Sequence, residues 1–167
     1  QISAVPNAYY HFTGWSGDII TNSTTLTLMM SRPHTVTGNF APNVTTNTET
    51  PEWWLAQYRL TNFNSDVLTD LDLDGVKTWE EYIAGTDPTN RNSVLLVDCN
   101  VLPNGRRTLS WFGVQGRIYA LEHLVSLYTN NWEAASFESP GADTVISITD
   151  AQLAPEYFYR VRVRVAE

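Results

Sequence analysis

Carboxylate side chains recur at alternate positions in the middle of this 167-residue chain, in the segment 70–81. Asp70, Asp72 and Asp74 stand at positions 1, 3 and 5 of that segment, a glycine stands at position 6, and Glu81 stands at position 12. Alternate residues of a tightly turning loop aim their oxygens at one centre, and a glutamate at position 12 can add both of its oxygens. The spacing therefore predicts a calcium site.

Two further oxygens complete the predicted coordination. Gly75 lets the backbone turn so that the Val76 carbonyl can bind, and Thr78 at position 9 binds directly or through a water. The four carboxylates repel one another without a cation, so we expect metal binding to be coupled to the folding of this segment. The alternative is a solvated acidic turn, because Asp and Gly also mark ordinary turns. A cation enclosed by these ligands leaves no open position for a substrate, which favours a structural role.

A helix is predicted on either side of the loop. The first helix is expected to have Thr50 as its cap and Pro51 as its first residue, and to end at Arg59 or Leu60. The second follows the loop and is expected to end at Gly85, in the left-handed conformation that glycine adopts readily.

Two adjacent tryptophans lie on the first predicted helix. Trp54 belongs to the apolar stripe, whereas Trp53 lies about 100° around the helix axis from it. One core cannot bury both side chains equally, so one of the two is a candidate exposed aromatic.

The net charge of −8 is concentrated around the predicted metal loop. Residues 43–91 hold nine acidic and three basic side chains, whereas residues 92–167 hold eight and six, and residues 1–42 are balanced. An acidic chain without a basic stripe argues against nucleic acid or an anionic membrane as a partner.

Several features indicate an extracellular setting. No apolar run is long enough to cross a membrane, and the first residues do not form a signal peptide, so we expect a fragment whose signal lies upstream. Low-affinity calcium loops suit the extracellular or cell-surface environment. Cys99 is the only cysteine, and its apolar neighbours predict a buried strand thiol.

Residues 1–42 read as short strands separated by turns, at 2–5, 9–15, 25–29 and 35–40. The segments 4–18, 26–29 and 35–40 resemble the divergent internalin-type β-repeat of bacterial surface and secreted proteins. Ala8 replaces the usual glycine of that family, and the family's first strands are missing, so the chain is expected to begin inside the repeat. Phe12 and Trp15 are then expected in a core, not on a ligand platform.

A second resemblance covers the metal segment. Residues 54–58, 70–75 and 80–90 look like the single calcium repeat related to dockerin and thrombospondin type 3 repeats, found near the ends of large secreted bacterial proteins, many of them polysaccharide-degrading. The likeness implies a helix-loop-helix unit with the ligands named above, and Asp87 as a weaker contributor. Lys77 replaces the apolar residue that pairs two such loops, which implies an unpaired loop. True dockerins carry two repeats, so docking to cohesin is not expected.

From residue 92 onward the pattern predicts six alternating strands, at 93–101, 106–112, 117–125, 131–138, 144–148 and 156–165. Residues 108–111, 117–122 and 157–163 resemble a fibronectin type III-like sandwich, which implies that Trp111 is an inter-sheet core residue. Arg160, Arg162 and Arg164 alternate along the last strand and share one face. That face is either solvated and protective of an edge, or a site for an acidic ligand.

We therefore expect a mainly β chain of three modules: a partial β-repeat at 1–42, a linker and EF-hand-like calcium unit at 43–91, and an antiparallel sandwich at 92–167. The three histidines lack metal spacing, and the short motifs of nucleophilic or phosphate-binding enzymes are absent. We do not expect an enzyme.

The predicted role is a non-catalytic, calcium-stabilised accessory region of a secreted, polysaccharide-active protein whose catalytic domain lies upstream. Exposed aromatic side chains can stack on sugars, and Trp53, Tyr128 and Trp132 are the candidates for binding polysaccharide. The rival hypothesis is a structural spacer or surface-attachment region whose aromatics fill small cores.

Overall fold

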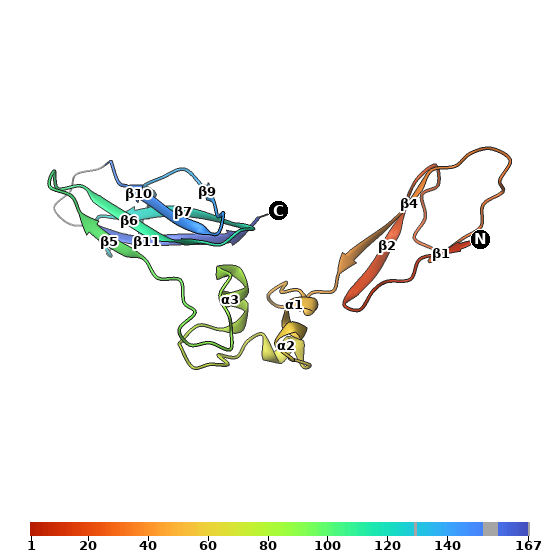
Figure 1. The fold of residues 1–167 in the computed structure, drawn as a ribbon, viewed down its shortest axis with the longest axis horizontal. Helices are drawn as coiled ribbons and strands as arrows, with labels where there is room; N and C mark the ends of the chain where they lie inside the picture. The colour runs from red at the N-terminus through yellow and green to blue at the C-terminus, as the bar shows by residue number, and fades with distance from the viewer. Residues whose placement is uncertain (129, 152–156, 167) are drawn as a thin grey trace. The chain divides into compact units, whose positions relative to one another are not determined.

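The computed structural model describes residues 1–128, 130–151 and 157–166. The described chain is mainly β, with several small antiparallel sheets and short helices, as the sequence predicted (Figure 1). It divides into two compact units, residues 1–69 and 70–167. The division into three modules, at 1–42, 43–91 and 92–167, remains a prediction.

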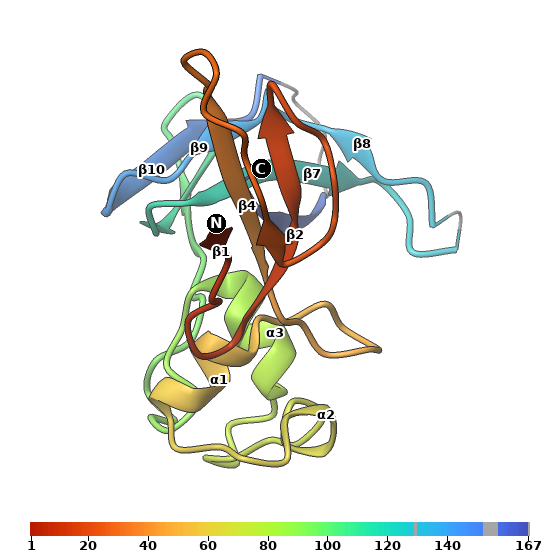
Figure 2. The ribbon, with the colours of Figure 1, turned by 90° about the vertical axis from the view of Figure 1, so that its right-hand side faces the viewer.

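The first unit begins with two pairs of antiparallel strands, which Figure 2 shows in red to orange. The short strands β1 and β3 pair with each other, and the longer strands β2 and β4 form a second ribbon. Their bounds are β1 Ile2–Ser3, β2 Tyr10–Gly17, β3 Thr25–Leu26 and β4 Val36–Pro42.

Aromatic side chains hold the β2–β4 ribbon together. The Phe12 ring lies 5.4 Å from the Trp15 ring and 5.5 Å from the Phe40 ring, measured between centroids. Trp15 is 9% exposed, and its indole N–H donates to the Ser23 carbonyl over 2.9 Å. The indole is buried with its one donor satisfied, which confirms Trp15 as a core residue, while Phe12 is half-buried.

Helix α1, Glu52–Gln57, is shorter than predicted and has a different cap. Pro51, not Thr50, occupies the cap position, and its carbonyl accepts hydrogen bonds from the backbone N–H groups of Trp54 and Leu55. The Thr50 side chain is instead buried, with its hydroxyl 3.0 Å from that of Thr48. The predicted cap was wrong because threonine hydroxyls there bond to one another.

A second short helix, α2 at Phe63–Asp66, was not predicted. The Asp66 carboxylate accepts the backbone N–H groups of Thr61 and Asn62, at 3.2 and 2.9 Å, and so closes this turn onto the preceding loop. Such local side-chain bonding favours short turns over longer helices.

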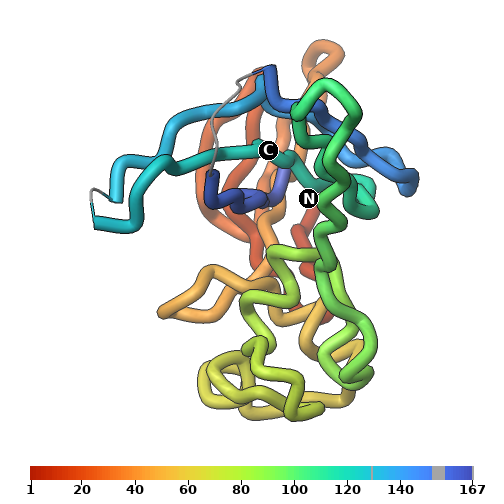
Figure 3. Tube along the Cα trace, turned by 90° about the vertical axis from the view of Figure 1, so that its left-hand side faces the viewer, coloured from red at the N-terminus to blue at the C-terminus, as the bar shows by residue number. Residues whose placement is uncertain are grey.

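The second unit starts at the acidic loop and continues through one helix into two sheets. In Figure 3 the chain can be followed from the end of this helix, through residues 85–97, to the first strand of the unit, which begins at Asp98. The elements are α3 Thr78–Ala84, β5 Asp98–Val101, β6 Arg107–Gly113, β7 Arg117–Leu124, β8 Glu133–Ala134, β9 Ser139–Pro140, β10 Thr144–Thr149 and β11 Phe158–Val165.

The two sheets form the expected antiparallel sandwich. One sheet has the order β10-β6-β5, and the other has the order β11-β7-β8, with β9 also paired to β7. Leu109 and Trp111 of β6 pack with Tyr119 and Leu121 of β7 in a core whose members are at most 2% exposed. The structure thus confirms Trp111 as an inter-sheet core residue.

Three expectations for this unit were wrong. Cys99 is exposed, because β5 is a short edge strand whose four residues all face solvent. The strand predicted over 93–101 is limited to those four residues, and that over 131–138 is reduced to β8, with β9 following it. Apolar alternation alone cannot reveal that a segment lacks a partner on its second edge.

Candidate metal centre

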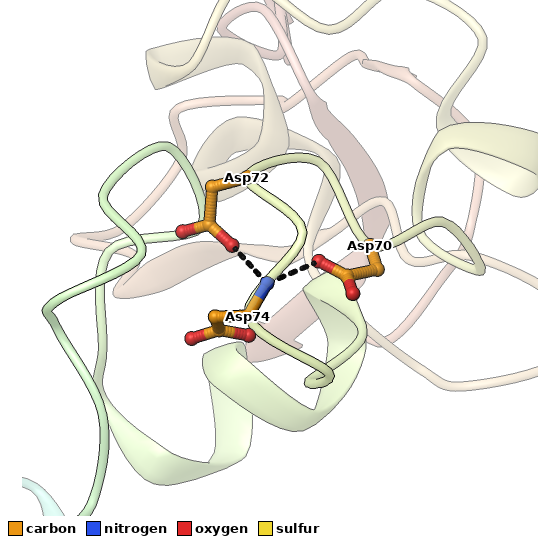
Figure 4. Close-up of side chains that lie close together, drawn as sticks. All are labelled: Asp70, Asp72 and Asp74. Atoms are coloured by element: carbon orange, nitrogen blue, oxygen red, sulfur yellow. Dashed lines mark hydrogen bonds between the residues drawn. The ribbon is translucent and has the colours of Figure 1, made fainter.

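The loop after residue 69 brings three aspartates together. Ligand oxygens of Asp70, Asp72 and Asp74 all lie within 4.8 Å of one another, and each side chain is half-buried (Figure 4). Oxygen atoms at this separation could hold one cation. The alternate spacing read from the sequence therefore produces a convergent cluster.

Backbone N–H groups of the loop orient these carboxylates. Asp70 accepts from Leu73 at 2.8 Å with Oδ1 and from Gly75 at 2.9 Å with Oδ2, and Asp74 accepts from Val76 at 2.8 Å. The turn requires positive φ angles of 64° at Leu73 and 98° at Gly75. Glycine is needed at position 75 for this backbone conformation alone, because a Cβ there would meet no atom within 4 Å.

Glu81, on α3, is not part of that group of three aspartates, but the charges of Asp72 and Asp74 act on its carboxyl group. Its side chain is fully buried, and burial, followed by the charges of Asp72 and Asp74, raises its pKa to about 7. The largest cause is desolvation, which disfavours the charged form, and nearby like charges act in the same direction. A bound cation would reverse both effects.

Three buried carboxylate oxygens of the loop and of α3 have no hydrogen-bond partner. They are Oδ2 of Asp72, Oδ2 of Asp74 and Oε2 of Glu81. Buried polar atoms are normally satisfied, so these unpartnered carboxylate oxygens are suited to bind a cation. The residues present fit a hard cation that prefers oxygen ligands.

The other predicted ligands lie on the loop, at the start of α3 and just after α3. Val76 is half-buried, and Thr78 is fully buried at the start of α3. Asp87 ranks below Asp72 and Asp74 among the groups that raise the Glu81 pKa, and its Oδ1 accepts from the hydroxyl and backbone N–H of Thr89. Asp87 thus caps a local turn, and its contribution to a cation site stays a prediction.

Helix α3 is positioned at both ends. At its start the Glu80 carboxylate accepts the Lys77 backbone N–H over 2.9 Å, and at its end Gly85 adopts φ 80° in the left-handed region, as predicted. Thr86 then donates its hydroxyl to Glu81 Oε1 over 3.3 Å. These bonds hold Glu81 in the helix and leave its other oxygen available.

The three aromatic candidates for sugar binding differ in exposure. Tyr128 is fully exposed, whereas Trp53 and Trp132 are half-buried. Trp54 is 9% exposed and Trp53 is half-buried, so neither tryptophan of the adjacent pair is fully exposed. The Arg160 guanidinium carbon lies 4.3 Å from the centroid of the Trp132 ring and covers one of its faces.

The arginines of the last strand share one face, and two glutamates lie among them. Arg160 Nε is 2.7 Å from Glu122, Arg162 Nε is 3.3 Å from Glu122, and Arg164 is 2.7 Å from Glu138. Arg162 also lies 3.7 Å from Glu138. The pairing leaves a net charge of +1 on this stripe. The register that places Arg160 opposite Glu122 could have been found only after β7 and β11 had been aligned.

Sequence reasoning did not identify a buried polar cluster in the sandwich. His123 Nδ1 lies 2.9 Å from Asp150 Oδ2, Tyr159 donates its hydroxyl to the same oxygen over 3.1 Å, and the Tyr157 ring stacks on the imidazole. Burial, and then the Asp150 charge, raise the Tyr159 pKa to about 12. The residues lie on separate strands and loops, and no spacing signals their meeting.

Comparison with known protein families finds a match to the first part of the chain. Residues 1–44 match the Divergent InlB B-repeat domain, a repeat typical of non-catalytic regions of bacterial surface and secreted proteins. The match supports the first resemblance noted in the sequence. No curated protein and no solved structure matches the chain. Within the described residues, no helix has the length and apolarity needed to cross a membrane.

Proposed function

We propose that this chain is a calcium-stabilised, non-catalytic accessory region of a secreted or surface-exposed bacterial protein. The Divergent InlB B-repeat at residues 1–44 supports the non-catalytic role and the setting. The observation that carries the calcium assignment is the fully buried Glu81, whose unpartnered oxygen accompanies unpartnered oxygens of Asp72 and Asp74.

Calcium fits this ligand set better than the smaller magnesium ion. Calcium accepts six to eight oxygens in flexible geometry, including both oxygens of one carboxylate, whereas magnesium demands a near-octahedral shell and retains waters. In the proposed shell, Asp70, Asp72, Asp74 and Glu81 supply carboxylate oxygens. The Val76 carbonyl and Thr78, directly or through water, complete it.

Thermal unfolding with calcium and with excess chelator tests this proposal. Calcium should raise the melting temperature of the parent, and Glu81→Gln should remove most of that increase. Glu80→Gln is the matched control, because it is the adjacent carboxylate on the same helix and its amide oxygen can still accept the Lys77 N–H. Equal melting of the parent in calcium and in chelator would overturn the calcium assignment.

Polysaccharide binding is the finer proposal. The fully exposed Tyr128 supports it, since a phenol ring in solvent offers an open face to a sugar. Trp53 and Trp132 are secondary candidates, the latter with one face already covered by Arg160. An accessory glycan-binding role would imply a catalytic domain upstream in the same polypeptide.

Affinity electrophoresis on plant and algal polysaccharides separates glycan binding from a structural spacer. Glycan binding predicts retardation of the calcium-loaded parent and weaker retardation of Tyr128→Ala. Tyr9→Ala is a control for loss of an aromatic side chain elsewhere, since Tyr9 is 39% exposed and packs on Phe63. Absence of retardation on every polysaccharide would favour the spacer.

A further inference from the structure

Arg117 links the second sheet to the helix that carries Glu81. From the first position of β7, its Nε donates to the Ile83 carbonyl over 2.7 Å, and its terminal nitrogen donates to the Tyr82 carbonyl. The guanidinium carbon also lies 5.3 Å from the centroid of the Tyr82 ring. One side chain thus contacts two backbone carbonyls and one ring of α3.

These contacts lie at the C-terminal end of the short helix α3. The last carbonyls of a helix have no partner within it and carry the negative end of the helix dipole, so a cation that donates to them is doubly favourable. Helix α3 has seven residues, and a helix of this length is unstable by itself in water. It therefore depends on what holds its two ends.

The metal loop holds one end of α3, and the sandwich holds the other. Glu81 lies immediately before the Tyr82 and Ile83 carbonyls that Arg117 contacts. A second contact supports the same junction, because a Cβ placed on Gly85 would lie 3.0 Å from the Val114 side chain. Within this unit α3 also packs against β11, whose Val165 pairs with Arg117.

We propose that Arg117 couples the metal loop to the β-sandwich, so that a cation bound at Glu81 stabilises the sandwich as well as the loop. The inference rests on the proposed calcium site. Without the cation, repulsion among the carboxylates loosens the loop and α3, and Arg117 loses its ordered acceptors. With the cation, the ordered helix end becomes a fixed part of the sandwich. We call the contacts of Arg117 with the Tyr82 and Ile83 carbonyls the clamp. Coupling is reciprocal, so breaking the clamp should also weaken metal binding.

Hydrogen-deuterium exchange of the full chain, with peptides resolved by mass spectrometry, tests the coupling. At calcium one hundred times its dissociation constant, the largest possible gain in protection is about 100-fold. In the parent we expect calcium to increase the protection of peptides from β6 and β7 by at least about tenfold. In Arg117→Met, which keeps the aliphatic stem but not the donors, the increase should be less than about twofold. Arg106→Met is the control, since Arg106 is an exposed arginine of the same unit.

Calcium binding, measured separately by calorimetry, distinguishes failure of the proposed calcium site from failure of the Arg117 coupling. Failure of the parent to bind calcium overturns the proposed site and thereby the premise of the coupling. Binding by parent and variant with the same calcium-dependent protection of β7 overturns the clamp alone. If Arg117→Met does not fold, Arg117→Lys keeps the charge and one donor group; a response smaller than that of the parent then supports the clamp, and an equal response overturns it.

Discussion

The Thr86 hydroxyl donates to one carboxyl oxygen of Glu81 over 3.3 Å, while the other Glu81 oxygen is buried without a partner. One oxygen is thus oriented by the protein and the second is left for a ligand. Burial, followed by the charges of Asp72 and Asp74, raises the pKa of this carboxyl group, and the Thr86 bond opposes that rise. These effects set the pH behaviour of the metal-free protein.

The first prediction concerns that pH behaviour. The Glu81 pKa is raised to about 7 in the folded protein from 4.5 for the free side chain, so between those values the folded state binds more protons than the unfolded state. The stabilising contribution of protonated Glu81 is fully present below pH 4.5 and is lost as pH rises to about 7. Glu81→Gln, which mimics the protonated form, should therefore gain stability over the parent across this window in chelator, by on the order of 1–2 kcal/mol.

Urea unfolding in chelator at several pH values measures this difference. Calcium should abolish the advantage of Glu81→Gln by favouring the charged form of the parent. Glu80→Gln serves as the control that leaves the buried group intact. A parent-to-variant difference that does not change between pH 4.5 and 8 would contradict the raised pKa.

The second prediction isolates the backbone requirement of the loop. Gly75→Ala forces an alanine into φ 98°, a conformation that costs L residues roughly 1–2 kcal/mol, although no atom obstructs the new methyl group. Gly116→Ala is a matched control in the β6–β7 turn, with φ 78° and equally open space. Both variants should lose similar stability, but only Gly75→Ala should weaken calcium binding in a calorimetric titration. Equal calcium affinities for the two variants would show that the loop tolerates another backbone path.

The third prediction concerns the buried polar cluster of the sandwich. Asp150 is 1% exposed and accepts from His123 and Tyr159. Asp150→Leu should destabilise the chain by about 1–3 kcal/mol, because it leaves buried donors unpaired. Tyr159→Phe removes only one of these bonds and should cost less, about 1 kcal/mol. Urea midpoints rank the two variants, and a larger loss in Tyr159→Phe would argue against Asp150 as the centre of the cluster.

The fourth prediction decides between the two interpretations of the arginine face. Glu122 and Glu138 lie among the three arginines and leave a net charge of +1, so the parent should elute from an acidic polysaccharide column at low salt. The double variant Glu122→Gln/Glu138→Gln carries +3 on the same stripe and should be retained to higher salt. Strong retention of the parent, with no further gain in the variant, would instead support a built anion site.

Local spacing determined much of this protein. The positions of Asp70, Asp72 and Asp74 predicted a convergent cluster because a tight loop aims alternate side chains inward. Gly85 predicted the helix end because few other residues adopt its conformation. The mainly β character followed from alternation, and Trp111 was predicted as a core residue from its likeness to a sandwich strand. These are properties of short segments.

Tertiary structure decided the rest, because it depends on which segments meet. The exposure of Cys99 follows from β5 being an edge strand, and the pairing of Arg160 with Glu122 follows from the register of β7 and β11. Arg117 reads in the sequence as an ordinary strand residue, yet its donors reach the carbonyl oxygens of Tyr82 and Ile83, 35 and 34 residues away. Contacts of this range are set by the free energy of packing the whole unit, and no local pattern encodes them.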